Sequence, residues 1–270
     1  MILEKYRESS GIKIFHDGAD EEHDDYNSQG LDVLYNEEEK HFWFIARKEF
    51  IYQQIKNIVS PSSKIIEIGA GTGNVSRYLK SKGYTGIAIG EMHIKGLQYA
   101  KSYGINECYQ FDLLRTPFEK EFDAICLFDV LEHIEEDSRA LENINKMLTA
   151  QGHVILTVPA HTWLWNRDDL IAGHKRRYTK NELFKKLEKS GLKVIVSRYF
   201  FISIVPLLFL RRFLHRDDGT DILPEEYQAD ISMNPVLNNI LLYLSRFENK
   251  FNGYLPNILG GSLLVVATKK

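Results

Sequence analysis

A glycine-rich turn that follows an apolar run is the strongest chemical signal in the sequence. Residues 65–73 read Ile-Ile-Glu-Ile-Gly-Ala-Gly-Thr-Gly, so a strand-like segment ends in a turn that contains Gly69, Gly71 and Gly73. Glycine adopts positive φ without strain and lets the backbone approach a ligand closely. The spacing lacks the G-x-x-G of the dinucleotide fingerprint, so the turn by itself leaves the ligand open.

Two acidic residues end the next apolar runs along the chain. Glu91 ends the second run, and Asp112 ends the third. A carboxylate at the first of these positions can accept hydrogen bonds from both hydroxyls of a ribose, and one at the other can accept from the exocyclic amine of adenine. Because open α/β sheets bind ligands at the carboxyl ends of their strands, these acids predict an adenosine site beside the glycine turn.

Further acids near the glycine turn favour a positively charged ligand. Glu67 precedes the glycines, and Asp129 ends the fourth apolar run. A pyrophosphate binds a helix N-terminus without carboxylates nearby, whereas these acids attract a cation such as a sulfonium. Arg47 can pair with a free carboxylate on such a ligand, and a surface salt bridge is the alternative. The aromatic residues 42–44 are expected to pack in the core, and a ring that lines the cofactor pocket is the alternative.

Histidine and aromatic residues after the fourth and fifth runs are candidates for contact with a second substrate. His133 suits a general base near neutral pH, and a histidine that braces the loop is the alternative. Segment 161–178 suits a sugar, a phenol or an anionic group, and a solvated basic loop is the alternative. The candidate substrate-binding residues are His161, Trp163, His174, Arg177 and Tyr178.

In the part of the chain that carries these candidate residues, short apolar runs alternate with amphipathic segments. This alternation predicts an α/β domain with a parallel sheet. The predicted strands are 64–68, 86–90, 108–111, 122–128, 153–158, 192–197 and 262–268. The predicted helices are 74–82, 94–103, 137–148 and one that ends near residue 189. A capping box at Thr179 and Glu182 begins the last of these helices.

The remaining segments flank or interrupt this core. Residues 61–198 and 262–270 form the predicted core, and residues 1–60 have helical rather than strand-like spacing. Residues 199–261 are predicted to be a helical insertion that shapes access of the acceptor, because connections of this length usually have a function.

The insertion begins with an apolar run at 199–210, which is followed by basic residues. A run of 12 residues is shorter than the ~20 that span a bilayer. The segment is expected either to cover the core as a lid or to lie at a membrane surface, with its cations near lipid phosphates. The basic residues are Arg211, Arg212, His215 and Arg216.

Composition narrows the class of protein. A net charge of −3 gives no general attraction to nucleic acid, so no nucleic-acid partner is expected. Cys108 and Cys126 lie in apolar runs without metal-ligand spacing, which favours buried reduced thiols and predicts no metal site. The acidic run at 20–25 is unlike a signal peptide, so the expected location is the cytoplasm, with peripheral contact at the inner face of the membrane as a variant.

Together these motifs resemble the class I S-adenosylmethionine-dependent methyltransferase family, in its small-molecule branch of types 11 and 12. The resemblance rests on the glycine turn, Glu91, Asp112 and the segment Asp129-Val-Leu-Glu-His-Ile134, and covers about residues 40–198 and the final strand. It implies a Rossmann-like, doubly wound α/β fold. The mostly parallel seven-stranded sheet would carry helices on both faces and an antiparallel last strand.

The resemblance implies S-adenosylmethionine as the cofactor and assigns roles to the motif residues. The glycine turn, with Ala70, would wrap the methionine and ribose portions, and Glu91 would hold the ribose hydroxyls. The adenine would meet Asp112, Leu113 and Met92, and the methionine end would lie beside Phe128 or Asp129. This chain has Met92-His93 where the family often continues with Ser or Pro.

The leading hypothesis is therefore O-methylation of a small or lipid-linked acceptor of glycan, quinone-like or phenolic type. The pattern at 173–178 also resembles bacterial methyltransferases of surface-polysaccharide and lipid-linked glycan pathways. Two alternatives are a nicotinamide-dependent dehydrogenase and a non-catalytic, membrane-associated binding module of the same fold.

Overall fold

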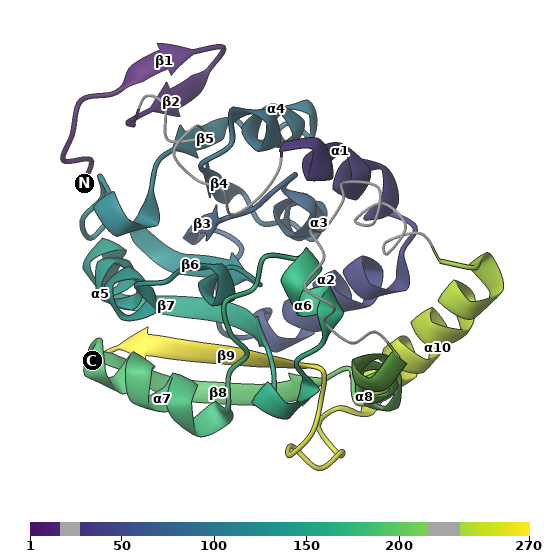
Figure 1. Cartoon of the computed structure of the whole chain (residues 1–270). Coiled ribbons are helices and arrows are strands. Elements are labelled where there is room, and N and C mark those ends of the chain that lie inside the picture. The colour runs from purple at the N-terminus through teal and green to yellow at the C-terminus, as the bar shows by residue number, and fades with distance from the viewer. Residues whose placement is uncertain (17–27, 215–232) are drawn as a thin grey trace.

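A computed structural model describes residues 1–16, 28–214 and 233–270, in which one mixed sheet carries helices on both faces (Figure 1). The strands are β1 (Arg7–Ser9), β2 (Ile12–Ile14), β3 (Lys64–Ile68), β4 (Gly86–Glu91), β5 (Glu107–Gln110), β6 (Phe122–Phe128), β7 (Leu148–Pro159), β8 (Leu192–Phe200) and β9 (Ser262–Lys269). The helices are α1 (Ser28–Glu37), α2 (Phe42–Ile55), α3 (Asn74–Ser81), α4 (Ile94–Ser102), α5 (Asp137–Met147), α6 (Arg167–Ile171), α7 (Lys180–Lys189), α8 (Val205–Leu214) and α10 (Pro235–Phe251). The short 3-10 helices η1 (Leu113–Arg115), η2 (Leu131–His133) and η3 (Thr162–Leu164) follow strand ends.

The strand order within these ranges is β1-β2-β5-β4-β3-β6-β7-β9-β8. The five neighbouring strands β5, β4, β3, β6 and β7 run parallel to one another. β9 lies between β7 and β8 and is antiparallel to both. The carboxyl ends of the parallel strands therefore meet at one edge of the sheet. This arrangement confirms the predicted Rossmann-like fold and its antiparallel last strand.

The sheet is wider than the seven predicted strands, because a hairpin near the N-terminus adds two more. β2 pairs parallel with β5, with Ile12 opposite Cys108, and β1 pairs antiparallel with β2. Ile12 and Ile14 are buried, whereas all of β1 is exposed. The hairpin departs from the helical spacing expected for residues 1–60, because strands of three residues carry too little alternation to stand out in the sequence.

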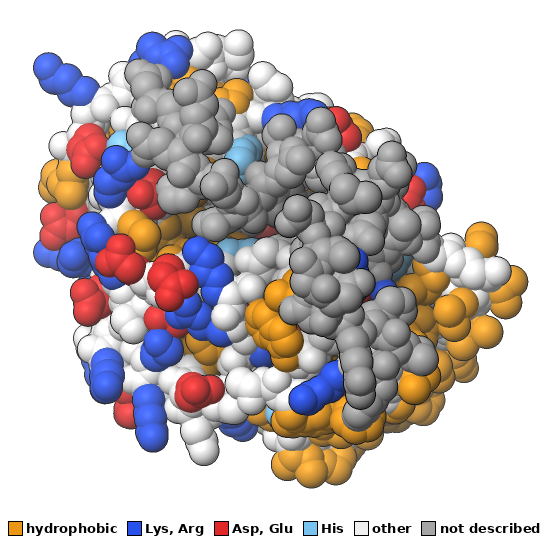
Figure 2. All heavy atoms as spheres, viewed as in Figure 1, with side chains coloured by type: hydrophobic (Ala, Val, Ile, Leu, Met, Phe, Trp, Pro, Cys, Tyr) orange, Lys and Arg blue, Asp and Glu red, His pale blue; other side chains and the backbone are white. Residues whose placement is uncertain are grey.

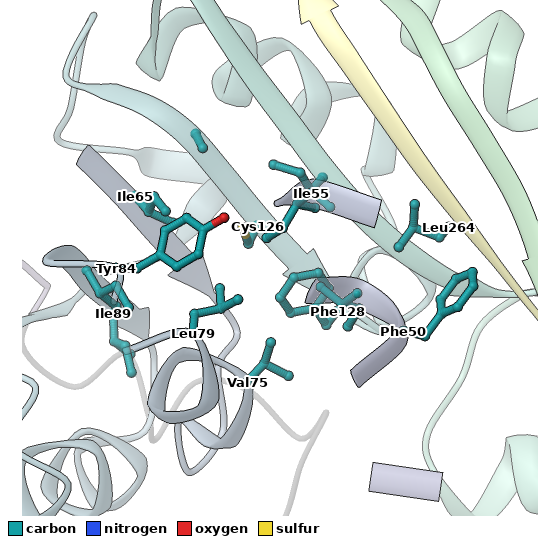
Figure 3. Close-up of a cluster of buried hydrophobic side chains, with 14 of the residues drawn as sticks. Phe50, Ile55, Ile65, Val75, Leu79, Tyr84, Ile89, Cys126, Phe128 and Leu264 are labelled. Carbon is teal, nitrogen blue, oxygen red and sulfur yellow. The ribbon is translucent and has the colours of Figure 1, made fainter. Parts of the chain in front are cut away.

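Alternate strand residues feed two hydrophobic layers, one on each face of the sheet. Ile65 and Cys126 belong to the layer under α2, α3 and α4, whereas Ile66 and Ile125 belong to the layer under α5 and α7. Both cysteines are buried and free, as predicted. Figure 3 shows part of the first layer, formed by Phe50, Ile55, Ile65, Val75, Leu79, Tyr84, Ile89, Cys126, Phe128 and Leu264.

The apolar run at 199–210 does not form one helix. β8 continues to Phe200, and α8 begins only at Val205. Phe200 and Phe201 are fully buried, and the Phe200 ring stacks on Phe50 of α2 with 4.5 Å between ring centroids. The first residues of the predicted insertion therefore belong to the core. His215 and Arg216 lie outside the described residues.

The second helix of the predicted insertion, α10, lies along α2 (Figure 1). Asn238 Oδ1 accepts a hydrogen bond of 2.8 Å from the backbone N–H of Phe42, and Asn249 Nδ2 donates one of 2.9 Å to the carbonyl of Ala46. Arg246 forms an ion pair with Glu49. Polar contacts thus fix one side of α10 to the core. Among the described helices, none has the length and apolar character needed to cross a bilayer.

Candidate functional site

A cavity of about 820 Å³ lies at the carboxyl ends of the parallel strands. Its lining includes the ends of β3, β4, β6 and β7 and residues of α1, α2, α6 and α8. The fold therefore brings residues from six separate motifs to one space. The predicted site residues in its lining are Arg47, Glu67, Gly69, Ala70, Gly71, Glu91, Met92, Asp112, Leu113, Phe128, Asp129, His133, His174 and Arg177.

The glycine turn and Glu91 form one hydrogen-bonded unit. Gly69 and Gly71 have positive φ values of 65° and 55°, and a Cβ atom on Gly69 would lie 2.6 Å from the side chain of Val130. Glu91 Oε2 accepts a hydrogen bond of 2.8 Å from the Gly71 N–H, while Oε1 accepts one of 2.8 Å from the Met92 N–H. The turn therefore holds the buried carboxylate in place at the cavity wall.

Glu67 lies behind the glycine turn rather than pointing freely into solvent. Its side chain is buried, and Oε2 accepts hydrogen bonds from the backbone N–H and the hydroxyl of Ser76 at the start of α3. Burial raises the pKa of Glu67 to about 7, although the Ser76 hydrogen bonds oppose the shift. Near neutral pH this carboxyl group is therefore balanced between its neutral and ionised forms.

Arg47 and Asp129 pair across the cavity, between α2 and the end of β6. Their side chains are only 10% and 14% exposed, and the guanidinium carbon lies 4.1 Å from the ring centroid of Trp43. Asp129 has a positive φ of 57°, which directs the chain into η2. Arg47 Nε is buried without a hydrogen-bond partner, so one N–H of this group can still donate to a ligand.

Asp112 caps η1 at the adenine end that the sequence predicts. Its Oδ1 accepts a hydrogen bond of 2.8 Å from the Leu114 N–H, and its Oδ2 lies 3.1 Å from Arg115 Nε. Leu113 and Met92 line the same cavity, and Phe111 lies in its wall. Asp112 therefore lies among apolar side chains of the cavity lining.

The acceptor side of the cavity contains two histidines in contact. The rings of His133, in η2, and His174, after α6, lie 4.9 Å apart in an edge-to-face arrangement. His174 Nδ1 lies 2.8 Å from Asp169 Oδ1. The segments after β6 and β7 thus bring two imidazole rings to the cavity wall.

Asp169 organises this side of the cavity, and the sequence analysis did not single it out. Its oxygens accept hydrogen bonds of 2.8 and 2.9 Å from Arg177 Nε and one of 2.9 Å from the Asn166 N–H. Although burial opposes ionisation, the partners His174 and Arg177 lower the pKa of Asp169. The signal available in the sequence was the capping box of Asn166 and Asp169, which begins α6 inside the predicted loop.

Glu132 was also overlooked, although it lies inside the quoted Asp129-Val-Leu-Glu-His motif. Its side chain is fully buried, and neither carboxylate oxygen has a hydrogen-bond partner. Burial and the nearby Asp129 carboxylate raise the pKa of Glu132 well above its usual range. Sequence position alone could not reveal this environment.

Four predicted site residues lie outside the cavity lining. Gly73 precedes α3, where a Cβ atom would lie 2.8 Å from Ile89 Cδ1, so its closest contacts are with the core. Tyr178 is buried, and its hydroxyl contacts Asp137 Oδ2 at 2.8 Å. His161 stacks on Tyr199, and Trp163 is 41% exposed beside them.

The family model of a methyltransferase domain matches residues 35–197, which include all the predicted cofactor-binding residues. The chain belongs to this methyltransferase family. The predicted family is thus confirmed, and with it S-adenosylmethionine as the cofactor. No curated protein matches the chain in sequence.

Solved structures share the fold at low sequence identity. An S-adenosylmethionine-dependent methyltransferase from Mesorhizobium loti superposes with a TM-score of 0.53 at 17% identity, over 82% of this chain and 98% of that one. A Thermotoga maritima methyltransferase, described as a possible histamine N-methyltransferase, gives 0.55 and 17% over 90% and 100% of the two chains. The [4+2]-cyclase SpnF gives 0.51 and 15% over 82% and 79%. The last example shows that this fold also carries other chemistry, so the acceptor must be argued from the site.

Proposed function

We propose that this methyltransferase transfers a methyl group to a hydroxyl of a small or lipid-linked acceptor. The observation that carries the proposal is that one cavity joins the glycine turn and Glu91 to His133 and His174. The residues proposed for the cofactor and a proton acceptor thus share one cavity, which an in-line transfer requires.

The residues present fit S-adenosylmethionine. Glu91 supplies carboxylate oxygens for the ribose hydroxyls, and Asp112 with Leu113 supplies an acid and an apolar surface for the adenine. The Arg47 guanidinium, with its unpartnered Nε, is available for the carboxylate of the methionine portion. The Asp129 carboxylate in the cavity lining suits a positively charged sulfonium and disfavours the diphosphate of a nicotinamide dinucleotide.

The chain's own part in the reaction is to orient the acceptor, exclude water and hold a proton. When bound, S-adenosylmethionine supplies an electrophilic methyl group on a positively charged sulfur. A ring nitrogen of His133 takes the hydroxyl proton of the acceptor, so that the oxygen attacks as its anion. Arg177 and His174 keep their positions through Asp169, which leaves the shape of the acceptor side fixed.

The test is turnover with purified full-length protein. Wild-type protein is expected to bind S-adenosylhomocysteine in calorimetry and to form it from S-adenosylmethionine with a phenolic or lipid-linked glycan acceptor. His133→Asn should lower the turnover number by 10²-fold or more, the usual contribution of a general base, and keep cofactor affinity. His153→Asn, in β7, is the matched control. Cofactor binding without turnover on any acceptor would instead support a non-catalytic module.

An exposed apolar face on the insertion supports a lipid-linked acceptor. Tyr243 and Phe247 of α10 are 71% and 56% exposed, and Tyr254 and Ile258 beyond its end are 89% and 74% exposed. Figure 2 shows hydrophobic side chains gathered over α10. A monomer rarely exposes so continuous an apolar patch unless it binds a membrane or a partner.

We assign this face to a lipid surface with anionic headgroups. It continues through the exposed Leu207 and Leu210 of α8, and the same helix lines the cavity with Leu207, Leu208 and Arg211. In the last turn of α8 the exposed Arg212 suits lipid phosphates, whereas Arg211 pairs with Asp168 at 3.1 Å. An acceptor held in the membrane would thus meet the cavity directly.

Liposome sedimentation tests the assignment. The variant Ile240→Ser with Phe247→Ser removes two exposed side chains of α10 and should lower binding to vesicles that contain phosphatidylglycerol by at least fivefold. Cofactor affinity should stay within about threefold, roughly 0.6 kcal/mol. The control Ile195→Ser removes an exposed apolar side chain of β8. Equal vesicle binding by wild type, variant and control would remove the membrane from the proposal.

A further inference from the structure

Glu132, His133 and His174 form a cluster of potential metal ligands at the acceptor side of the cavity. One ligand atom from each residue lies within 4.8 Å of the others. Glu132 and His133 come from η2 after β6, and His174 comes from the segment after α6, so the cluster joins two loops. His133 and His174 also line the cavity.

The Glu132 carboxylate has no hydrogen-bond partner in its buried position. The side chain has no exposed surface, and its Oε1 lies 3.8 Å from His174 Nε2, too far for a hydrogen bond. A buried carboxylate without a partner costs several kcal/mol, and such a group in a native fold requires an explanation. A proton on the carboxyl group or a bound metal ion would each remove this cost.

His174 presents a lone pair to this carboxylate. Its Nδ1 contacts Asp169 Oδ1 at 2.8 Å, and Asp169 is an ion-paired acceptor, held by Arg177 and by the Asn166 N–H. Nδ1 must therefore carry the proton of a neutral ring, which leaves Nε2 without one. A carboxylate that fixes the tautomer through the far ring nitrogen is the usual second partner of a metal-bound histidine.

We propose that Glu132, His133 and His174 bind a divalent transition metal ion. Two imidazoles and one carboxylate suit Zn²⁺, Fe²⁺ or Ni²⁺ better than the all-oxygen preference of Mg²⁺. Metal bonds of about 2.0–2.2 Å place ligand atoms at most ~4.4 Å apart, so the cluster needs to close only slightly. Three protein ligands leave open positions, and these face the cavity because both histidines line it.

The metal site deepens the proposed function and rests on it for its role, though not for its existence. An acceptor oxygen in an open position would ionise at a lower pH, because a bound divalent cation stabilises the anion. With the metal bound, His133 would be a ligand in place of the base assigned above, and the acceptor proton would pass to water. Acceptors with two neighbouring oxygens would bind best, since they can occupy two open positions.

Metal binding can be tested without any acceptor. Full-length protein treated with a chelator is titrated with Zn²⁺ by calorimetry and with Co²⁺ by visible absorption, which reports the ligand geometry. One equivalent is expected to bind with a Kd in the micromolar range or tighter. Glu132→Gln and His174→Gln should each weaken binding at least tenfold and remove the Co²⁺ bands.

The control is Glu135→Gln, which changes a nearby acid outside the cluster that does line the cavity, and it should stay within twofold of wild type. S-adenosylhomocysteine binding, measured on every variant, verifies the fold and tests the proposed function separately. Absence of a one-to-one site in wild-type protein would overturn the metal site and leave Glu132 as a protonated acid. Unchanged binding in both Gln variants would do the same, because the metal would then sit elsewhere.

Discussion

Glu91 is the residue through which we propose that the glycine turn and the cofactor are linked. Its two oxygens already accept N–H groups from Gly71 and Met92, so the carboxylate is oriented before any ligand binds. Because the carboxylate is already oriented, binding costs less entropy. A charge-assisted hydrogen bond to a ribose hydroxyl would strengthen binding further. Glu91 should therefore contribute more to the free energy of cofactor binding than a carboxylate on a mobile side chain would.

Glu91→Ala is expected to weaken S-adenosylhomocysteine binding by about 1.5–3 kcal/mol, which is roughly tenfold to more than a hundredfold in Kd. Calorimetry at constant pH measures the change. Glu142→Ala, on the exposed side of α5, is the control and should bind as the wild type does. An unchanged dissociation constant for Glu91→Ala would place the ribose elsewhere.

Glu67 should make stability depend on pH. The unfolded chain ionises this carboxyl group above its ordinary pKa of 4.5, whereas the folded chain retains the proton up to about pH 7. The folded state therefore binds more protons in this window, and the free energy of unfolding falls as pH rises through it. Above pH 7 both states are ionised, and the loss is complete.

Glu67→Gln keeps an oxygen for Ser76 and cannot ionise, so it should escape this loss. Between pH 5 and 8, wild-type protein is expected to lose on the order of 2 kcal/mol relative to the variant. Urea unfolding across this pH range gives the comparison, with Glu142→Gln as the control. Parallel pH profiles for wild type and Glu67→Gln would show that the Glu67 carboxyl group titrates normally.

At the scale of elements, α4 holds the glycine turn in place. A Cβ atom on Gly96 would lie 2.3 Å from the carbonyl oxygen of Gly71 and 3.2 Å from Glu91 Cγ. Both neighbours belong to the cofactor side of the cavity. Gly96 of α4 and Gly71 of the glycine turn thus share one close contact, although they are distant from each other in sequence.

Gly96→Ala should therefore push α4 and the turn apart. The expected loss is about 1–3 kcal/mol of unfolding free energy, as for other overpacked sites. Cofactor affinity should fall at least fivefold, because the Gly71 N–H no longer holds Glu91. Gly253→Ala is the matched control, since a Cβ atom there meets nothing within 4 Å. Denaturant unfolding and calorimetry provide the two measurements, and wild-type values for both would show that α4 does not support the turn.

The elements that the sequence predicts correctly are those with a strong local pattern. The apolar run ending at Ile68 and the capping box of Thr179 and Glu182 require no distant partner, and both occur as expected. The hairpin at Ile12 becomes recognisable only through its pairing with β5. Phe200 and Phe201 have the composition of a lid, but their burial against α2 depends on tertiary packing.

The same limit applies to the candidate site. Glycines and acids at strand ends could be selected because the topology of a doubly wound sheet collects strand ends at one edge. The environment of Glu132 could not be predicted from the sequence, because it depends on how the segment after α6 folds back onto η2. Asp169, Arg177 and His174 form their contacts only through that return of the chain.

For the whole molecule, cofactor binding should raise thermal stability. At a ligand concentration 100 times Kd, the folded state gains about 2.7 kcal/mol, which corresponds to a rise in Tm of roughly 5–10 °C for a chain of this size. Differential scanning fluorimetry with S-adenosylhomocysteine measures it. The reduced nicotinamide dinucleotide is the control and should give no shift. A larger shift with the dinucleotide would favour a dehydrogenase-like ligand.

The hairpin of β1 and β2 has a consequence for solubility. It covers β5 and ends the sheet in a short strand whose residues Arg7 and Glu8 are charged and exposed. Short charged edges prevent one sheet from adding to another. Removal of residues 1–16 would uncover β5 and the ring of Phe118, which packs on Phe15. Light scattering should then detect aggregates of the truncated protein at concentrations where the full chain stays dispersed.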